Sequence, residues 1–169
     1  EAAIGTMFNL DEVSQRILNA DGASWIKKVK DKSTCFQLDP FHRNKAVKEK
    51  IHDSKACQDI LELLQTEKIE EVFHYLELYR NSLCEEGEIQ DVEELIRYYE
   101  NNREGLVPYQ SQGLELPENP DGLEYRNMGT MENHVWSVLA KRMKHGHRSW
   151  SRRGGNHLAK ILAKKCSGK

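Results

Sequence analysis

The chain has 169 residues, of which 38% are hydrophobic and 31% are charged, and its formal net charge is −2. This length fits one domain, or one domain with a sub-domain, and it allows a core inside a highly polar surface. No apolar run approaches the ~20 residues that span a bilayer, which excludes an integral membrane protein, and we expect no signal segment.

Two short strands with a helix between them are predicted near the start of the chain. The segment at 16–20 predicts a strand that ends at Asp21-Gly22, and 23–30 predicts a short helix. TCFQL at 34–38 is a β-branched and aromatic run that predicts a second strand, ending at Asp39-Pro40. Two strands separated by a short helix indicate a parallel βαβ unit.

The pattern from residue 45 to about 102 is helical. Apolar residues recur there at spacings of three and four, interrupted by a break at 85–87, which predicts a helical hairpin or small bundle. Residues 103–124 hold all but one of the prolines and predict a loop or extended connector. Thr130 is expected to cap a helix to about Lys144, followed by the loop SWSRRGG and a last helix over about 156–164.

Charge is strongly segregated along the chain. Residues 126–169 contain eleven basic residues and one acid, Glu132, a net charge of +10, so the first 125 residues carry −12. Basic side chains neutralise phosphates, and this segregation favours a nucleic-acid partner over a merely solvated helix face. The candidate DNA contacts are Arg142, Lys144, Arg148, Trp150, Arg152 and Arg153.

Two acids have positions that suit a functional site. Asp21 lies between a predicted strand and a helix, where sites form in open α/β sheets, although an N-cap or an Asp-Gly turn is the commoner explanation. Glu132 is in the first turn of its helix, where interaction with the helix dipole contributes ~0.3–1 kcal/mol. Three and four residues further on are Val135 and Trp136, so Glu132 has no local ion-pair partner. It borders the apolar stripe of the helix, and a partly buried carboxylate needs a metal or a donor.

Histidines and cysteines give weaker signals. Asp39 and His42 are three residues apart just beyond the second strand, but a surface histidine near a turn is usually not functional. His145 and His147 lack the further ligands of a zinc site. The four cysteines are widely spaced without a CxxC pair, which indicates reduced thiols in a cytoplasmic protein. Since the first residue is not Met, we expect a fragment or a processed product.

Four segments together resemble a known family. They are NLDEV…ILNADGASWIK, CFQLDPFHRNKAV, YYENNREGLVPY and YRNMGTMENHVWSVLAKRMKHGHRSWSRRGGNHLAKIL. In order and spacing they resemble the C-terminal part of the ISLre-type bacterial insertion-sequence transposases, relatives of the Mutator-like transposases. The last segment is the most specific, and the resemblance covers essentially the whole chain.

The resemblance implies a helix-dominated α/β fold with part of a ribonuclease-H-like core, namely about two parallel strands. Residues 1–44 would be the C-terminal half of that core, 45–124 an all-helical insertion with its connector, and 125–169 a core helix with a basic tail. It implies that Asp21 and Glu132 bind Mg²⁺ or Mn²⁺, with Asp39 and His42 as auxiliary residues. In that family three carboxylates bind two metal ions, and Asp21 and Glu132 match the second and third; the first would lie upstream of Glu1.

The same resemblance implies DNA strand cleavage and strand transfer by the intact enzyme, acting on transposon ends and target DNA. A homo-oligomer is one assembly that the enzyme could form. Two other classes stay open. A decayed element would survive as an inactive basic DNA-binding module whose acids only cap helices. A helical protein-binding domain predicts DNA binding that does not weaken as salt rises. A shared metal site would place the carboxylates of Asp21 and Glu132 well under ~10 Å apart.

Overall fold

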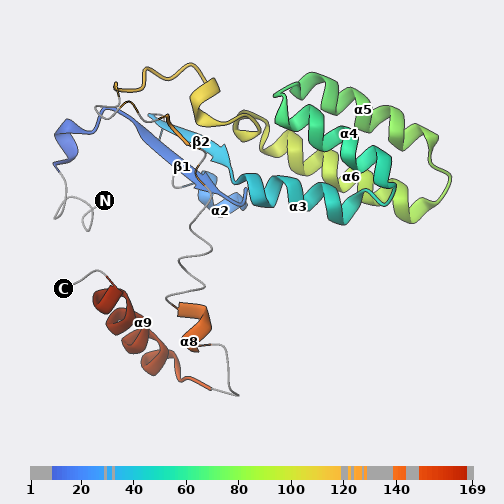
Figure 1. Cartoon of the computed structure of the whole chain (residues 1–169). Helices are drawn as coiled ribbons and strands as arrows, with labels where there is room; N and C mark the ends of the chain where they lie inside the picture. Colours follow the sequence, from blue (N-terminus) through green and yellow to red (C-terminus); the bar gives the residue numbers. More distant parts are fainter. Residues whose placement is uncertain are drawn as a thin grey trace. The chain divides into compact units, whose positions relative to one another are not determined.

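The computed structural model describes residues 9–28, 30–31, 33–118, 122, 124–126, 128, 139–143 and 149–166. The chain divides into two compact units, Glu1–Met128 and Gly129–Lys169, and each is described by itself. The first unit contains a small sheet followed by a group of helices (Figure 1). Within the part of the chain that is described, no helix is long and apolar enough to cross a membrane.

The sheet consists of two parallel strands, β1 (Arg16–Ala20) and β2 (Thr34–Leu38), paired from Arg16↔Thr34 to Ala20↔Leu38. The short helix α2 (Ser24–Lys27) connects them, after the turn η1 (Leu10–Glu12) at the start. The predicted strand-helix-strand unit and its parallel pairing are therefore confirmed. β2 is the more buried strand, because its last three residues are all buried.

The helices that follow are α3 (Pro40–Lys50), α4 (Ser54–Gln65), α5 (Ile69–Ser82) and α6 (Glu86–Asn101). They pack on one another as the small bundle expected from the apolar spacing. α3 begins five residues earlier than predicted. The carboxylate of Asp39 accepts the N–H of Phe41 at 2.9 Å, and Pro40 occupies the first helical position, where no N–H is needed.

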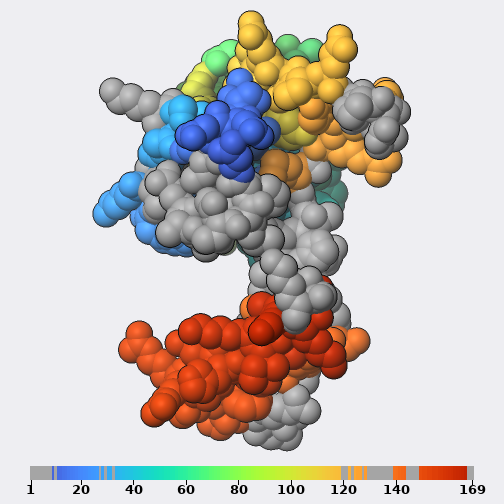
Figure 2. Space-filling model, turned by 90° about the vertical axis from the view of Figure 1, so that its left-hand side faces the viewer, coloured from blue at the N-terminus to red at the C-terminus, as the bar shows by residue number. Residues whose placement is uncertain are grey.

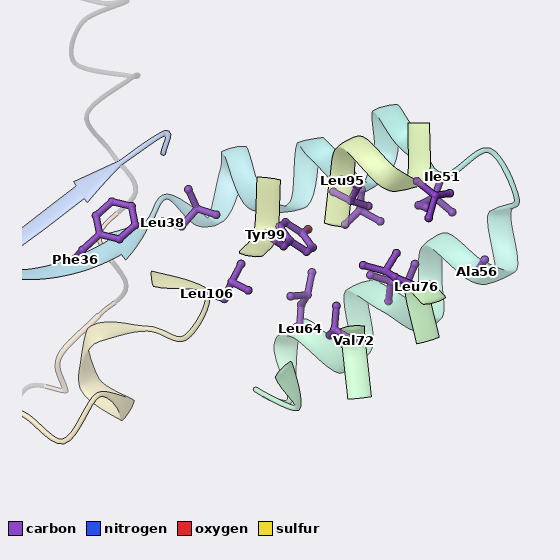
Figure 3. Packing of buried hydrophobic residues seen from close by; sticks show 13 residues of the cluster. Phe36, Leu38, Ile51, Ala56, Leu64, Val72, Leu76, Leu95, Tyr99 and Leu106 are labelled. Carbon is purple, nitrogen blue, oxygen red and sulfur yellow. The ribbon is translucent and has the colours of Figure 1, made fainter. Parts of the chain in front are cut away.

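The hydrophobic core lies among these four helices and extends to β2. Figure 3 shows its side chains directed toward one another, from Phe36 and Leu38 on the strand to Leu64, Leu76, Leu95 and Tyr99 on the helices. The turn η2 (Arg103–Gly105) packs tightly on the strand, since a Cβ on Gly105 would lie 2.6 Å from the Phe36 ring. Only glycine fits there without a shift of the strand.

The connector after α6 is ordered by hydrogen bonds to β2. It contains the turn η3 (Tyr109–Ser111), and the backbone N–H of Tyr109 donates to Oε1 of Gln37 at 2.9 Å. Nε2 of Gln112 donates to the backbone carbonyl of Phe36 at 2.9 Å. The part of the predicted loop region around 105–112 is therefore fixed along one edge of the sheet.

The second unit contains α8 (Lys141–Met143) and α9 (Arg152–Cys166). Most of the helix predicted from Thr130, namely 130–138 and 144, lies outside the described residues. The loop predicted over SWSRRGG is wrong from Arg152 onward, where α9 already begins. Oγ of Ser151 accepts the N–H of Gly154 at 3.1 Å, so a serine N-cap starts the helix before the two glycines.

Acidification is expected to destabilise the first unit between about pH 4 and pH 2. Hydrogen bonds from Thr34, and then from Ser33, lower the pKa of Asp31 from 3.8 to about 2. Because the folded pKa lies below the unfolded one, this carboxylate stabilises the fold above that window and stops doing so as pH falls through it. Urea unfolding at a series of pH values measures the effect. Asp31→Asn should reduce the slope between about pH 4 and 2, and an unchanged slope would contradict the assignment.

Candidate active site at the carboxyl ends of the strands

The carboxyl ends of β1 and β2 bring two acidic residues to neighbouring positions. Asp21 directly follows β1 and Asp39 directly follows β2. Parallel pairing extends past the strand ends, because the N–H of Asp39 donates to the carbonyl of Ala20 at 2.8 Å. Ligands of open α/β sheets bind at this edge, so two acids found from the sequence lie where a site is expected.

Asp21 is exposed and its side chain forms a local turn. Its Oδ1 accepts the N–H of Ala23 at 3.0 Å. The N-cap position of α2 is Ala23, so Asp21 does not cap that helix. The carboxylate therefore reaches solvent, where it can meet a cation.

Asp39 differs from Asp21 because it is only 4% exposed and caps α3 through Phe41. This hydrogen bond offsets part of the cost of burying a carboxylate. His42 is half-buried in the first turn of α3, and its ring meets the Phe41 ring edge-on at 5.4 Å between centroids. A structural role for Asp39 is thus evident, and the auxiliary catalytic roles of Asp39 and His42 stay predictions.

Tyr98 of α6 joins this group from a distant part of the chain. Its hydroxyl donates to the backbone carbonyl of Asp21 at 2.8 Å. Burial, and then the negative charges of Asp21 and Asp39, raise the pKa of Tyr98 to about 12. The phenol therefore stays protonated and remains a hydrogen-bond donor at neutral pH.

Asn102, which follows α6, packs under the turn after Asp21. It is 1% exposed, and its Nδ2 donates to the carbonyl of Tyr98 at 2.8 Å. Its buried Oδ1 has no hydrogen-bond partner among the described residues. Gly22 has φ +83°, and a Cβ there would lie 2.7–2.9 Å from the Asn102 amide, so the position requires glycine.

Sequence reasoning did not assign roles to Gly22, Tyr98 or Asn102. The segment YYENN was noticed only as part of the resemblance, although adjacent tyrosines and asparagines at a helix end were a visible signal. Two exposed aromatic side chains were also missed: Trp25 follows Asp21 closely, and Phe41 follows Asp39.

A cavity of about 300 Å³ opens between α3 and α6, and Tyr98 and His42 belong to its wall. Lysines and glutamates form much of the rest. Nζ of Lys50 contacts carboxylate oxygens of Asp91 and Glu94, each at 2.7 Å, so charges of both signs are balanced there. The lining shows no excess of either sign that would select an ionic ligand.

Several predicted site residues lie outside the described residues, namely Glu132, Lys144 and Arg148, together with His145 and His147. Within the described part, no group of three or more His, Cys, Asp or Glu residues could hold a metal ion. Asp21 and Asp39 offer the hard oxygen donors that Mg²⁺ prefers. They fit such an ion only as part of a larger set of ligands.

The second unit presents a basic surface around α9. Arg142, Trp150, Arg152 and Arg153 are exposed, and Leu162 is the buried residue of the helix. Side chains of this segment appear in red and orange in Figure 2. The indole N–H of Trp150 donates to the carbonyl of Met143 at 3.0 Å, which fixes the start of α9 against α8.

Comparison with known proteins relates almost the whole chain to a family. The model of a family described as Uncharacterised protein family (UPF0236) matches residues 3–169. No curated protein and no solved structure is significantly similar to the chain. The family match includes the strand ends and the basic segment together.

Proposed function

We propose that this chain, which belongs to the Uncharacterised protein family (UPF0236), is the C-terminal part of an ISLre-type DNA transposase with a ribonuclease-H-like core. The intact enzyme would cleave DNA strands and join them to target DNA. The observation that carries the proposal is the parallel strand pair, whose carboxyl ends place Asp21 beside Asp39. The sequence resemblance and the net charge of +10 on residues 126–169 add to it.

The proposal gives the acids different tasks. Asp21 is exposed and would hold a divalent metal together with Glu132, whereas Asp39 is buried and would fix the second strand end, with His42 as its auxiliary neighbour. Bound Mg²⁺ or Mn²⁺ would supply activation of a water or 3′-hydroxyl and stabilisation of the leaving oxygen. The basic residues of the second unit would bind the phosphates of the DNA.

DNA binding by the chain is expected to weaken as salt rises, because bound phosphates release counterions. Arg152→Ala and Arg153→Ala should each reduce the slope of log K against log salt by about one. Lys68→Ala is the matched control, since Lys68 is an exposed cation beside Glu71 in the acidic unit. Fluorescence anisotropy of a labelled duplex between about 50 and 200 mM salt measures this. An unchanged slope of log K against log salt in the variant that carries both substitutions would contradict a role for these arginines.

The function itself is tested on the longer protein. The gene is first sequenced upstream of the codon for Glu1. The question is whether it encodes, in the same reading frame, a further β-strand that ends in an aspartate. The protein extended to include that strand is then incubated with DNA bearing the ends of the element, with Mg²⁺ or with a chelator. Mg²⁺-dependent nicks at the element ends support the proposal. A stop codon or unrelated sequence upstream, or cleavage that ignores the chelator, contradicts it.

A second candidate is an inactive remnant that acts as a basic DNA-binding or helical interaction module. The observation in its favour is that Asp21 and Asp39 each accept a local backbone N–H, from Ala23 and Phe41, as acids with purely structural roles do. This candidate predicts salt-dependent DNA binding like that of the enzyme. It also predicts no change in any DNA product when Mg²⁺ is added.

A further inference from the structure

We propose that the carboxyl-terminal end of α6 positions Asp21, so that the helical region acts directly on the geometry of the candidate site. Tyr98 and Asn102 are the positioning residues, and the Asp21–Gly22 turn is what they hold. The catalytic consequence rests on the proposed function. The contact itself can be tested without it.

The hydroxyl of Tyr98 fixes the peptide that follows Asp21. It donates to the carbonyl of Asp21 at 2.8 Å across 77 positions of the sequence. The carboxylate of Asp21 is exposed, and its hydrogen bond to Ala23 is local. The hydrogen bond from Tyr98 therefore restricts the direction of the Asp21 side chain by fixing the backbone of Asp21.

Asn102 packs against the same Asp21–Gly22 turn. Tyr98 and Asn102 are four residues apart, so both reach the same side of the helix end. The Asn102 amide donates to the carbonyl of Tyr98 and presses against Gly22 so closely that a Cβ on Gly22 would not fit. The turn can therefore move only if the end of α6 moves with it.

α6 is in turn tied to α3, the helix that Asp39 begins. Lys50 of α3 bridges Asp91 and Glu94 of α6 at 2.7 Å each. The hydroxyl of Tyr99 donates to the carbonyl of Arg43 at 2.9 Å. One helix thus contacts the segments that follow both strands, and it can hold the two acids in a fixed relation.

The test is amide hydrogen exchange of the whole chain, followed by NMR at Ala23, whose N–H donates to the Asp21 carboxylate. Tyr98→Phe keeps the ring and removes the hydroxyl, and exchange at Ala23 should become roughly two- to tenfold faster relative to core amides. Tyr75→Phe is the matched control, because it also removes a part-buried tyrosine hydroxyl that donates a hydrogen bond, here from α5 to Oδ2 of Asp59 on α4. It should leave the relative exchange at Ala23 unchanged. Equal rates at Ala23 in wild type and Tyr98→Phe would overturn the proposal.

A second variant covers the case in which Tyr98→Phe fails to fold. Asn102→Ala removes the amide that packs against Gly22, and exchange at Ala23 should again become faster relative to core amides. Unchanged relative exchange at Ala23 in Asn102→Ala would show that the end of α6 does not hold the turn. That result would equally overturn the proposal.

Addition of Mn²⁺ to the same samples separates this inference from the proposed function. Broadening of the Asp21 amide signal by Mn²⁺, with unchanged Ala23 exchange in Tyr98→Phe, would support the metal assignment and refute the positioning role. Faster Ala23 exchange supports the positioning role whether or not Mn²⁺ broadens the signal, because Asp21 fits a metal ion only as part of a larger set of ligands. In the intact enzyme, a positioning role predicts that Tyr98→Phe needs more Mg²⁺ for half-maximal cleavage and that excess Mg²⁺ restores the rate.

Discussion

Replacing Asp21 with Asn is expected to reduce the Mg²⁺-dependent DNA cleavage that we propose for the intact protein about a thousandfold or more. A metal ion contributes several kcal/mol to the transition state, and each 1.36 kcal/mol is about a tenfold change in rate. The fold should persist, because Asn keeps the side-chain oxygen that accepts the N–H of Ala23. Single-turnover cleavage at saturating Mg²⁺ measures the loss. Glu132→Gln is expected to act in the same way and to leave DNA binding intact.

Asp31→Asn is the matched control for Asp21→Asn. Asp31 is also an exposed acid beside the sheet, but it lies near the amino ends of the strands and contacts Arg16 at 2.9 Å. Its replacement should alter acid stability and leave cleavage unchanged. Asp21→Cys adds a test of direct ligation, because a thiolate is a softer ligand and should restore more activity with Mn²⁺ than with Mg²⁺. Full activity of Asp21→Asn would refute the ligand assignment.

Leu95→Ala is expected to lower the free energy of unfolding by about 2–5 kcal/mol, because it leaves a cavity in the centre of the helical core. Leu95 is 1% exposed and lies among the core side chains in Figure 3. Small domains are stabilised by only about 5–15 kcal/mol in total, so this loss is large. Urea unfolding monitored by circular dichroism measures it.

The control for Leu95→Ala is Leu78→Ala, the same chemical change at a position on α5 that is 57% exposed. Because little apolar area is removed from the core there, the change in unfolding free energy should stay within about 0.5 kcal/mol. Equal losses of unfolding free energy in the two variants would show that Leu95 is not part of the hydrophobic core.

The strands could be predicted to the residue because local signals agree there. β-branched and aromatic residues fill 34–38, and Asp-Gly and Asp-Pro end the two runs. The start of α3 was not predicted, because Asp-Pro is typical both of a turn and of a helix N-cap followed by proline at the first helical position. At α9 two glycines indicated a loop, but the capping bond from Ser151 decided the helix start.

The site could be predicted only in part, for a different reason. Asp21 and Asp39 were found because each follows its own strand, which is a local feature of the sequence. The contact of Tyr98 with Asp21 joins residues 77 positions apart, and no pattern along the chain encodes it. The fit of Gly22 against Asn102 likewise depends on how α6 packs, which periodicity does not specify.

The connector that follows α6 is hydrogen-bonded to β2 and so affects where a further strand could pair with the sheet. One side of β2 pairs with β1, and on the other side the Gln112 amide holds the Phe36 carbonyl. The side of β1 that does not pair with β2 is thus the place for a further strand, and a parallel one there would end next to Asp21. In such a wider sheet Asp21 would stand in the middle of the row of strand ends and Asp39 at its margin. The order of the strands alone would then place Asp21 next to a residue at the end of the added strand. Asp39 would keep only its role as the N-cap of α3.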